Sequence, residues 1–185
     1  MKNNSNMELE AKIAIENIDV MEKHLETLGA ERIGCYVETD RFFDFPDKRF
    51  KNADSAIRLR DRKNCSTQQS NYRLTFKGPC QESPFKCRNE IEFPVEWPEQ
   101  VQAFLEAIGL ICFAHYTKRR HCWRWGDCSI EVDELEGIGR FVEVEGPSES
   151  CIRKTLKALG LSDRPCIRES YLAMAIRHGL AKCPS

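Results

Sequence analysis

Charged residues, with one threonine, recur at every second position in seven short segments, and in most of these segments the residues between them are aliphatic or aromatic. The alternating members are Glu8/Glu10/Lys12, Arg58/Arg60, Arg73/Thr75/Lys77, Arg88/Glu90/Glu92, Lys118/Arg120, Glu131/Asp133 and Glu143/Glu145. Successive side chains of a strand point to opposite faces, so each segment is predicted to be a strand with one charged and one apolar face. A chain with so many strands of this kind must place their charged faces and their apolar faces in different environments.

Hydrophobic periodicity predicts about eight strands and four helices. Strands are expected at residues 7–15, 36–43, 55–61, 72–77, 88–95, 112–123, 128–134 and 140–145. Helices are expected at residues 19–28, 98–108, 149–159 and 169–178. Pro98 suits a first helical position and Ser148 an N-cap, while Gly29, Gly109 and Gly160 are suited to helix ends. Polar loops are expected at residues 46–54, 62–70 and 78–87.

The two faces of the strands constrain how the elements pack. Amphipathic helices must cover apolar sheet surface, and if they cover these apolar faces the charged faces turn toward one another. A sheet of about eight strands then curls into a barrel with a polar lumen and with the helices outside. The alternative is a sheet whose charged faces are simply solvated.

Length and composition restrict the class of protein. A chain of 185 residues suits one domain, predicted at residues 7–180 after a disordered tail at residues 1–6. A Glu-x-Glu strand followed by a helix ending in Gly occurs three times, with no linker between the copies. The net charge of −1 argues against a nucleic-acid partner, and no apolar run is long enough to span a membrane. Without a signal peptide, a cytoplasmic protein is expected.

The chain has ten cysteines, and none of them forms a Cys-x-x-Cys pair. This spacing argues against a zinc ribbon. A disulfide framework is an alternative, but the expected compartment favours reduced, mainly structural thiols.

The charged faces also indicate a chemistry. Carboxylates at positions i and i+2 lie roughly 6.5–7 Å apart, and a divalent cation such as Mg²⁺ or Mn²⁺ relieves their repulsion. The Arg and Lys clusters need an anion, and the guanidinium fork of Arg suits phosphate. Together they favour a polyphosphate bound as its metal complex. No Walker-type glycine-rich loop is present, so side chains must hold the phosphates.

Several segments resemble a known family. Glu8-Leu-Glu-Ala-Lys12 resembles the Glu-x-Glu-x-Lys signature of the CYTH superfamily, which is named for class IV adenylate cyclases and thiamine triphosphatases. The other matching segments, in family order, are Ala56-Ile-Arg-Leu-Arg60, Leu74-Thr-Phe-Lys-Gly-Pro79, Arg88-Asn-Glu-Ile-Glu92, Lys118-Arg-Arg120, Ile130-Glu-Val-Asp133, Gly137-Ile-Gly-Arg-Phe-Val-Glu-Val-Glu145 and Ser170-Tyr171. The resemblance covers residues 7–175 and is greatest to the class IV adenylate cyclase-like branch.

The resemblance implies an α+β fold, with an eight-stranded antiparallel barrel, called a triphosphate tunnel, and helices packed on its outside. It implies metal binding by Glu8, Glu10, Asp133, Glu143 and Glu145, phosphate binding by Lys12, Arg58, Arg60, Lys77, Arg88, Lys118 and Arg120, and catalysis by Glu8, Glu10 and Lys12. Arg73, Glu90 and Glu92 are expected to face the lumen. Arg119 has the opposite parity and is expected to point outward, and Asp40 and Asp44 are treated as residues of a strand end.

The resemblance and the residues leave the reaction open. A cyclase would convert ATP to cyclic AMP and pyrophosphate, whereas a triphosphatase would attack inorganic or thiamine triphosphate with water. A non-catalytic protein that senses polyphosphate or nucleotide is the third alternative, although anion binding by itself would not require the carboxylates. The oligomeric state is also open, with a homodimer as one alternative.

Overall fold

The computed structural model describes residues 7–181, and the tail expected at residues 1–6 lies outside them. The strands are β1 (Met7–Ile15), β2 (Glu31–Asp44), β3 (Ala56–Asn64), β4 (Ser70–Cys80), β5 (Lys86–Val95), β6 (Ile111–Trp125), β7 (Cys128–Leu135) and β8 (Gly139–Glu145). The helices are α1 (Ile18–Thr27), α2 (Arg49–Asn52), α3 (Pro98–Ala107), α4 (Glu149–Ala158) and α5 (Tyr171–Arg177). None of these helices is long and apolar enough to cross a membrane.

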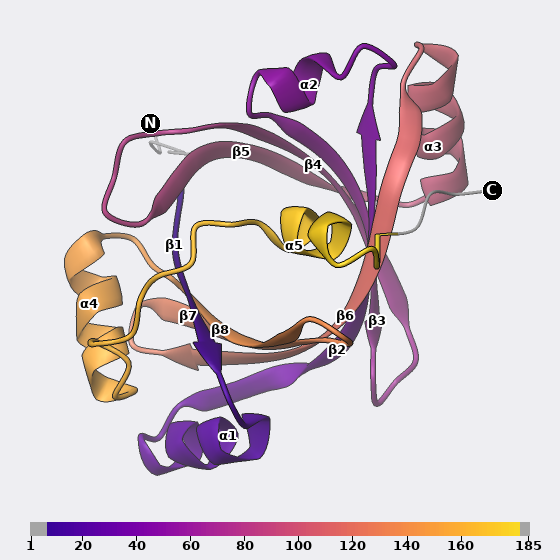
Figure 1. The fold of residues 1–185 in the computed structure, drawn as a ribbon. Coiled ribbons are helices and arrows are strands. Elements are labelled where there is room, and N and C mark those ends of the chain that lie inside the picture. Colours follow the sequence, from indigo (N-terminus) through magenta and orange to yellow (C-terminus); the bar gives the residue numbers. More distant parts are fainter. Residues whose placement is uncertain (1–6, 182–185) are drawn as a thin grey trace, which may run out of the picture.

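The strands form one closed barrel in the order β1-β5-β4-β3-β2-β6-β7-β8 (Figure 1). Strand β1 closes it by pairing with β5 on one side and β8 on the other, and every neighbouring pair is antiparallel. Closure leaves no free edge and separates an inner from an outer face along every strand. The predicted α+β fold with an eight-stranded antiparallel barrel is therefore confirmed.

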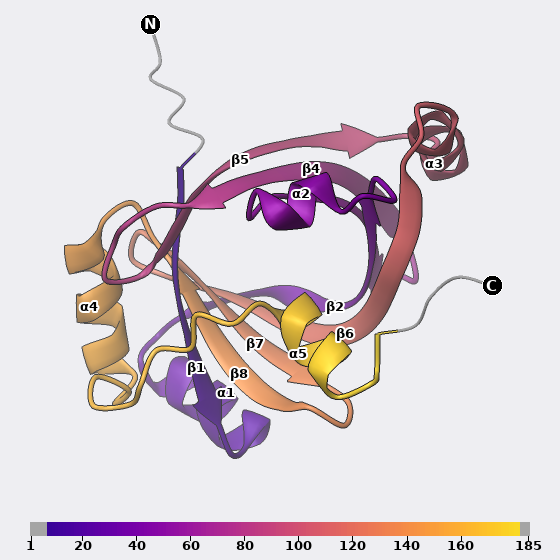
Figure 2. The same cartoon turned by 45° about the horizontal axis from the view of Figure 1, so that its top comes forward.

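Helices α1 and α4 cover the outer apolar faces of β1, β7 and β8 (Figures 1 and 2). The large fully buried side chains in this cluster are Ile13, Leu25, Ile130, Val132, Val142, Val144 and Ile152. Helix α3 similarly places Leu105 against Phe43 and Leu59 of β2 and β3. Burying these faces outside the barrel directs the alternating charged side chains inward, as the period-two pattern predicted.

Helix α5 has a different position from the other long helices. It lies across the opening of the barrel (Figures 1 and 2), where Tyr171 and Met174 pack against Phe42 and Phe141. Phe141 has the same parity as Glu143, so this cluster occupies the lumen side of the sheet rather than its outer wall. The expectation that the helices pack on the outside holds for α1, α3 and α4, whereas α5 closes part of the lumen.

Several stretches of the backbone differ from the sequence-based expectation, and the differences in β2 and α2 are the clearest. Strand β2 begins at Glu31 rather than residue 36, because a register shift between Arg32 and Gly34 interrupts the alternation that sequence periodicity detects. Helix α2 forms within a segment expected to be a loop. The buried carboxylate of Asp44 accepts hydrogen bonds from the backbone N–H groups of Phe50 and Lys51 at 3.0 Å and thereby stabilises that short helix.

The packing of α4 can be tested by truncating Ile152, which is fully buried between α4 and the barrel. We expect Ile152→Ala to lower the free energy of unfolding by about 2–5 kcal/mol, because the substitution leaves a cavity. Urea denaturation measures the change. Ile108→Ala is the matched control, since Ile108 is 51% exposed, and a loss as large as that of Ile152→Ala would contradict this account of the core.

Candidate active site

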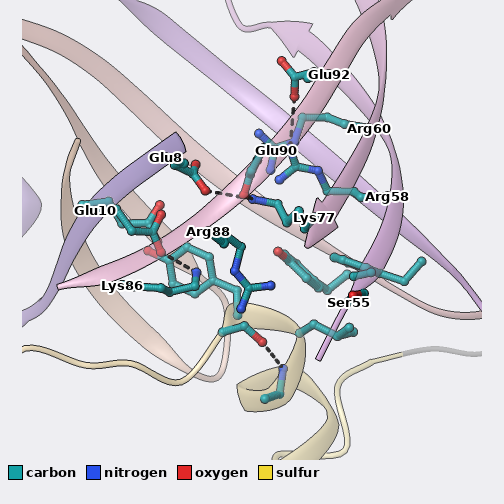
Figure 3. Close-up of a pocket in the computed structure, with 18 of the residues that line it drawn as sticks. Glu8, Glu10, Ser55, Arg58, Arg60, Lys77, Lys86, Arg88, Glu90 and Glu92 are labelled. Atoms are coloured by element: carbon teal, nitrogen blue, oxygen red, sulfur yellow. Dashed lines mark hydrogen bonds and ion pairs between the residues drawn. The ribbon is translucent and has the colours of Figure 1, made fainter. Parts of the chain in front are cut away.

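The barrel contains a cavity of about 670 Å³ that is lined mainly by charged side chains. This volume falls within the range of roughly 300–1,000 Å³ that is usual for small-molecule sites. The predicted residues that line it are Glu8, Glu10, Lys12, Arg58, Arg60, Lys77, Arg88, Glu90, Glu92, Lys118, Arg120, Glu143 and Glu145. One wall of the cavity, from β1, β3, β4 and β5, is shown in Figure 3. The structure thus brings together side chains from most of the barrel strands.

Lysines bridge the carboxylates of β1 and β5. The ammonium group of Lys77 lies 3.3 Å from a carboxylate oxygen of Glu8 and also contacts Glu90 (Figure 3). Lys86 pairs with Glu10 in the same way. Burial raises the pKa of Glu90 to about 8, and its hydrogen bond with Glu8 contributes in the same direction. The wall therefore neutralises its carboxylates in two ways, by ion pairs with lysine and by the raised pKa of Glu90.

Strand β2 provides a second, fully buried acidic group that holds the cations of neighbouring strands. Both carboxylate oxygens of Asp40 accept hydrogen bonds from Arg60, at 2.6 and 2.7 Å. Glu38 lies 3.1 Å from Arg60 and 3.5 Å from Lys118. Burial opposes the charged form of Asp40, but the adjacent guanidinium of Arg60 outweighs it and holds the pKa of this carboxyl well below its usual range.

Arg58 and Arg88 are less completely paired than Arg60. Arg58 donates to Thr75 at 3.1 Å and to Glu92 at 3.2 Å, but its buried Nε has no hydrogen-bond partner within residues 7–181. Arg88 donates to the sulfur of Cys80, and its Nε is likewise buried and unpartnered. A buried donor without an acceptor costs free energy. These two guanidinium groups therefore have capacity for an anion in the cavity.

Carboxylates of β7 and β8 continue the lining of the cavity on the side of β1 that faces away from β5. Glu10 lies directly across from Glu145 in the β1–β8 ladder, and Glu131 lies across from Glu143 in the β7–β8 ladder. Burial, followed by the negative charges of Glu8 and Glu10, raises the pKa of Glu145 to about 7. Burial also raises the pKa of Glu131 to about 8. Crowded carboxylates of this kind favour either protonation or a cation.

The carboxylates fit a divalent cation in donor chemistry. Mg²⁺ and Mn²⁺ prefer oxygen ligands, and the negative charge concentrated around Glu10 and Glu145 is what such an ion would neutralise. Within residues 7–181, however, no group of three or more Asp, Glu, His or Cys side chains is already arranged closely enough to hold a metal. Lys77 and Lys86 contact the β1 carboxylates instead, so metal binding would require these contacts to rearrange.

Two of the predicted lumen residues, Asp133 and Arg73, differ from the rest in position. Asp133 is fully buried, and its two oxygens accept from Arg120 and Lys118 rather than lining the cavity. A metal-binding role for Asp133 stays a prediction. Arg73 pairs with Glu92 at 2.9 Å and is 45% exposed, so it lies at the margin of the lumen. Arg119 is exposed, in agreement with its expected outward orientation.

Sequence reasoning missed several charged residues of the lumen. These are Glu38, Asp40, Arg62 and Lys86. Glu131 was expected on a charged strand face but was assigned no role in the site. Asp40 was expected at a strand end, but β2 continues to Asp44, so that Asp40 lies within the strand. Glu38 and Asp40 show the same i, i+2 spacing as the other charged pairs, and that spacing is the signal that could have found them. Lys86 was assigned to a loop because β5 begins two residues earlier than expected.

The Asp40–Arg60 pair predicts how stability depends on pH. Because the pKa of Asp40 is lowered by folding, its stabilising contribution is complete above the ordinary aspartate value of about 3.9 and is lost as the pH falls below it. We expect Asp40→Asn to lower the free energy of unfolding at neutral pH by about 3–5 kcal/mol, since it leaves Arg60 without its charged partner. The variant should also lose less stability than the wild type on acidification.

Urea denaturation across the acidic pH range measures both effects. Asp47→Asn is the matched control, because Asp47 also pairs with an arginine, Arg49, but on the surface. If the free energy of unfolding depended on pH equally in the wild type and in Asp40→Asn, the stabilising role of the Asp40–Arg60 pair would be contradicted.

Comparison with known proteins places these observations in a family. Residues 6–158 match the CYTH domain. A protein of Methanocaldococcus jannaschii, named "Putative adenylate cyclase MJ0240", is 29% identical over 177 residues, which are 91% of this chain and 98% of that protein.

Solved structures agree on the fold. The PH1819 protein of Pyrococcus horikoshii superposes with a TM-score of 0.80 at 24% identity, covering 92% of this chain and 98% of that one. HpAC1 of Hippeastrum is described as having a dominant triphosphatase activity. It superposes with a TM-score of 0.69 at 18% identity, covering 93% of this chain and 96% of that one. The family match covers most of the chain, and the closed barrel with its charged lumen agrees with it. The chain belongs to the CYTH family, whose domain is a triphosphate tunnel that binds triphosphate substrates and typically uses divalent metals.

Proposed function

We propose that this protein is a divalent-metal-dependent enzyme of the class IV adenylate cyclase type, which converts ATP to cyclic AMP and pyrophosphate. The observation that carries the proposal is the pair of buried, unpartnered Nε atoms of Arg58 and Arg88 in a cavity that also contains crowded carboxylates. A triphosphate would satisfy the guanidinium groups, and its metal complex would relieve the carboxylates.

The cations of the lumen would hold the phosphates. Arg58 and Arg88 each have an available N–H donor, and Lys77 lies beside them on the neighbouring strand β4. Lys12 of β1 and Lys118 and Arg120 of β6 line the same cavity. Arg60 binds Asp40 with both of its donors on one edge, so we assign it a supporting rather than a leading role in phosphate binding.

The carboxylates of Glu8, Glu10, Glu143 and Glu145 would hold the metal. When bound, Mg²⁺ or Mn²⁺ neutralises charge on the phosphoryl oxygens. The side chains themselves orient the triphosphate and exclude water from around it. In the cyclase reaction, the ribose 3′-oxygen forms a bond to the α-phosphorus, the bond from that phosphorus to the bridging oxygen breaks, and pyrophosphate leaves. A lumen carboxylate or solvent takes the hydroxyl proton.

The mouth of the cavity favours an organic triphosphate. Phe42, Phe113, Leu172 and Ile176 line it near α5, beside the charged interior. Apolar and aromatic side chains at this position would contact a nucleoside, whereas inorganic tripolyphosphate has no apolar part to occupy it. The name of the Methanocaldococcus relative also favours the cyclase.

A triphosphatase is the second candidate, because the described activity of the Hippeastrum protein favours it. In that reaction water attacks a terminal phosphorus instead of the ribose hydroxyl. The deciding experiment is to incubate the purified protein separately with ATP, tripolyphosphate and thiamine triphosphate, in Mg²⁺ or Mn²⁺, and to identify the products. Cyclic AMP with pyrophosphate supports the proposal, whereas release of orthophosphate alone supports the triphosphatase.

Removing one carboxylate charge tests the metal-binding side of the cavity. We expect Glu10→Gln to lower kcat by at least about a hundredfold with little change in melting temperature, because charge stabilisation of this kind is commonly worth that much. Turnover with excess metal and a thermal melt measure the two quantities. Glu134→Gln is the control, since Glu134 faces outward and pairs with Arg140. Full activity of Glu10→Gln would remove Glu10 from the mechanism.

The cationic side can be tested without turnover. Tripolyphosphate with Mg²⁺ should raise the melting temperature by several degrees at concentrations well above its Kd, Mg²⁺ by itself should do less, and AMP least. Arg58→Met should reduce the affinity for tripolyphosphate roughly tenfold to a hundredfold, because a charge-assisted hydrogen bond is lost.

Arg119→Met is the control for that substitution, since Arg119 is an exposed arginine on a neighbouring part of the barrel. Equal increases in melting temperature with AMP and with tripolyphosphate would contradict a triphosphate site. Strong tripolyphosphate binding without any product would favour the non-catalytic alternative.

A further inference from the structure

Tyr171, the first residue of α5, contacts two lysines of the lumen at the same time. Its ring centroid lies 3.9 Å from the Nζ atom of Lys12 and 4.7 Å from the Nζ atom of Lys118. The tyrosine is buried and lines the cavity, and the two lysines come from β1 and β6. Both distances are within the range of about 6 Å in which an aromatic face attracts an ammonium group.

We propose that Tyr171 is a positioning residue whose aromatic ring holds Lys12 and Lys118 in place for the phosphates of the substrate. The inference rests on the proposed function, because it gives a role to the ring only if these lysines bind phosphate.

An aromatic ring differs from a carboxylate in that it attracts an ammonium group without neutralising its charge. Two ammonium groups placed over one ring repel each other, and this geometry needs a compensating attraction. A carboxylate attracts an ammonium group but cancels its charge, as Asp40 does for Arg60. The negative face of an aromatic ring attracts the ammonium group and leaves its full positive charge for a phosphate. Lys12 also lies 3.5 Å from Glu143, and Lys118 lies 3.3 Å from Asp133 and 3.5 Å from Glu38. Tyr171 thus adds to these ion pairs an attraction that neutralises no further charge on the two lysines.

The surrounding contacts keep the ring in this position. Ser170 caps α5 by accepting a hydrogen bond from the backbone of Ala173, and Phe141 packs edge-on against Tyr171 with ring centroids 5.4 Å apart. Lys12 donates to the carbonyl oxygen of Glu169 at 2.8 Å, and the carbonyl oxygen of Lys12 accepts from Ile167. The segment that leads into α5 is therefore attached to the same lysine that the ring contacts.

The ring rather than the hydroxyl is the functional part of the side chain. Burial and the negative charge of Asp133 raise the pKa of Tyr171 well above its ordinary value, so the phenol stays neutral. Its hydroxyl oxygen makes no hydrogen bond of normal geometry with any residue in the described range 7–181. Phenylalanine at this position should therefore keep the function, and a side chain without an aromatic face should lose it.

Replacements that change the ring in steps test the proposal. Tyr171→Phe and a series of progressively fluorinated phenylalanines at position 171 keep nearly the same shape while weakening the negative face of the ring. We expect Tyr171→Phe to bind tripolyphosphate with Mg²⁺ within about twofold of the wild type in calorimetry, and affinity to fall steadily along the fluorinated series. Tyr171→Leu should bind about tenfold more weakly. The KM for the triphosphate that is turned over should rise in parallel, with a smaller change in kcat.

Phe141→Leu is the matched control, because it removes a ring from the same cluster but no cation contact. It should lower the melting temperature but weaken tripolyphosphate binding much less than Tyr171→Leu does, because the ring that contacts both lysines is still present; this difference separates positioning from packing. Constant tripolyphosphate affinity along the fluorinated series would overturn the role of Tyr171. An equal loss of that affinity in Tyr171→Phe and Tyr171→Leu would also overturn it. If Tyr171→Leu does not fold, the fluorinated series still decides. Failure of the wild type itself to bind tripolyphosphate would instead overturn the proposed function, and the inference with it.

Discussion

The fully buried carboxylates of Glu38 and Asp40 are the interaction on which the interior of this barrel depends. Closing the sheet brings arginines and lysines from several strands into one lumen, where unpaired charges are costly. Asp40 holds Arg60 through two hydrogen bonds, and Glu38 lies within ion-pair distance of Arg60, Lys118 and Arg120. Strand β2 thereby allows a cationic lumen to form in a folded protein.

The same pairing divides the cations into two groups. Arg60 has its charge largely compensated by Asp40 and Glu38, whereas Arg58 and Arg88, which line the same cavity, each retain a buried Nε without a hydrogen-bond partner among residues 7–181. Among the carboxylates of β1, β7 and β8, burial and, to a smaller extent, neighbouring negative charges raise the pKa values of Glu131 and Glu145. A cavity with available donors on one side and excess negative charge on the other complements a phosphate chain that carries a divalent cation.

Helix α5 connects the cap of the barrel to this charge arrangement. It supplies part of the apolar cluster at the opening and also the ring that contacts Lys12 and Lys118. Docking of the chain after α4 is therefore coupled to the placement of two lumen cations. The outer helices α1 and α4 have no such contact, because their apolar faces meet the outside of the sheet.

The sequence by itself determined which face of each strand is charged, because a period of two is a local property of the backbone. It also determined most helix boundaries, through Pro98, Ser148 and the terminal glycines, and it identified the main residues of the lumen, such as Glu8, Glu10 and Arg58. Only the tertiary structure decided which charges are paired, as with Arg60 and Asp40 or Arg120 and Asp133, and where Tyr171 lies. Cross-strand register and the docking of α5 depend on contacts between residues far apart in the chain, and no local pattern of residues specifies those contacts.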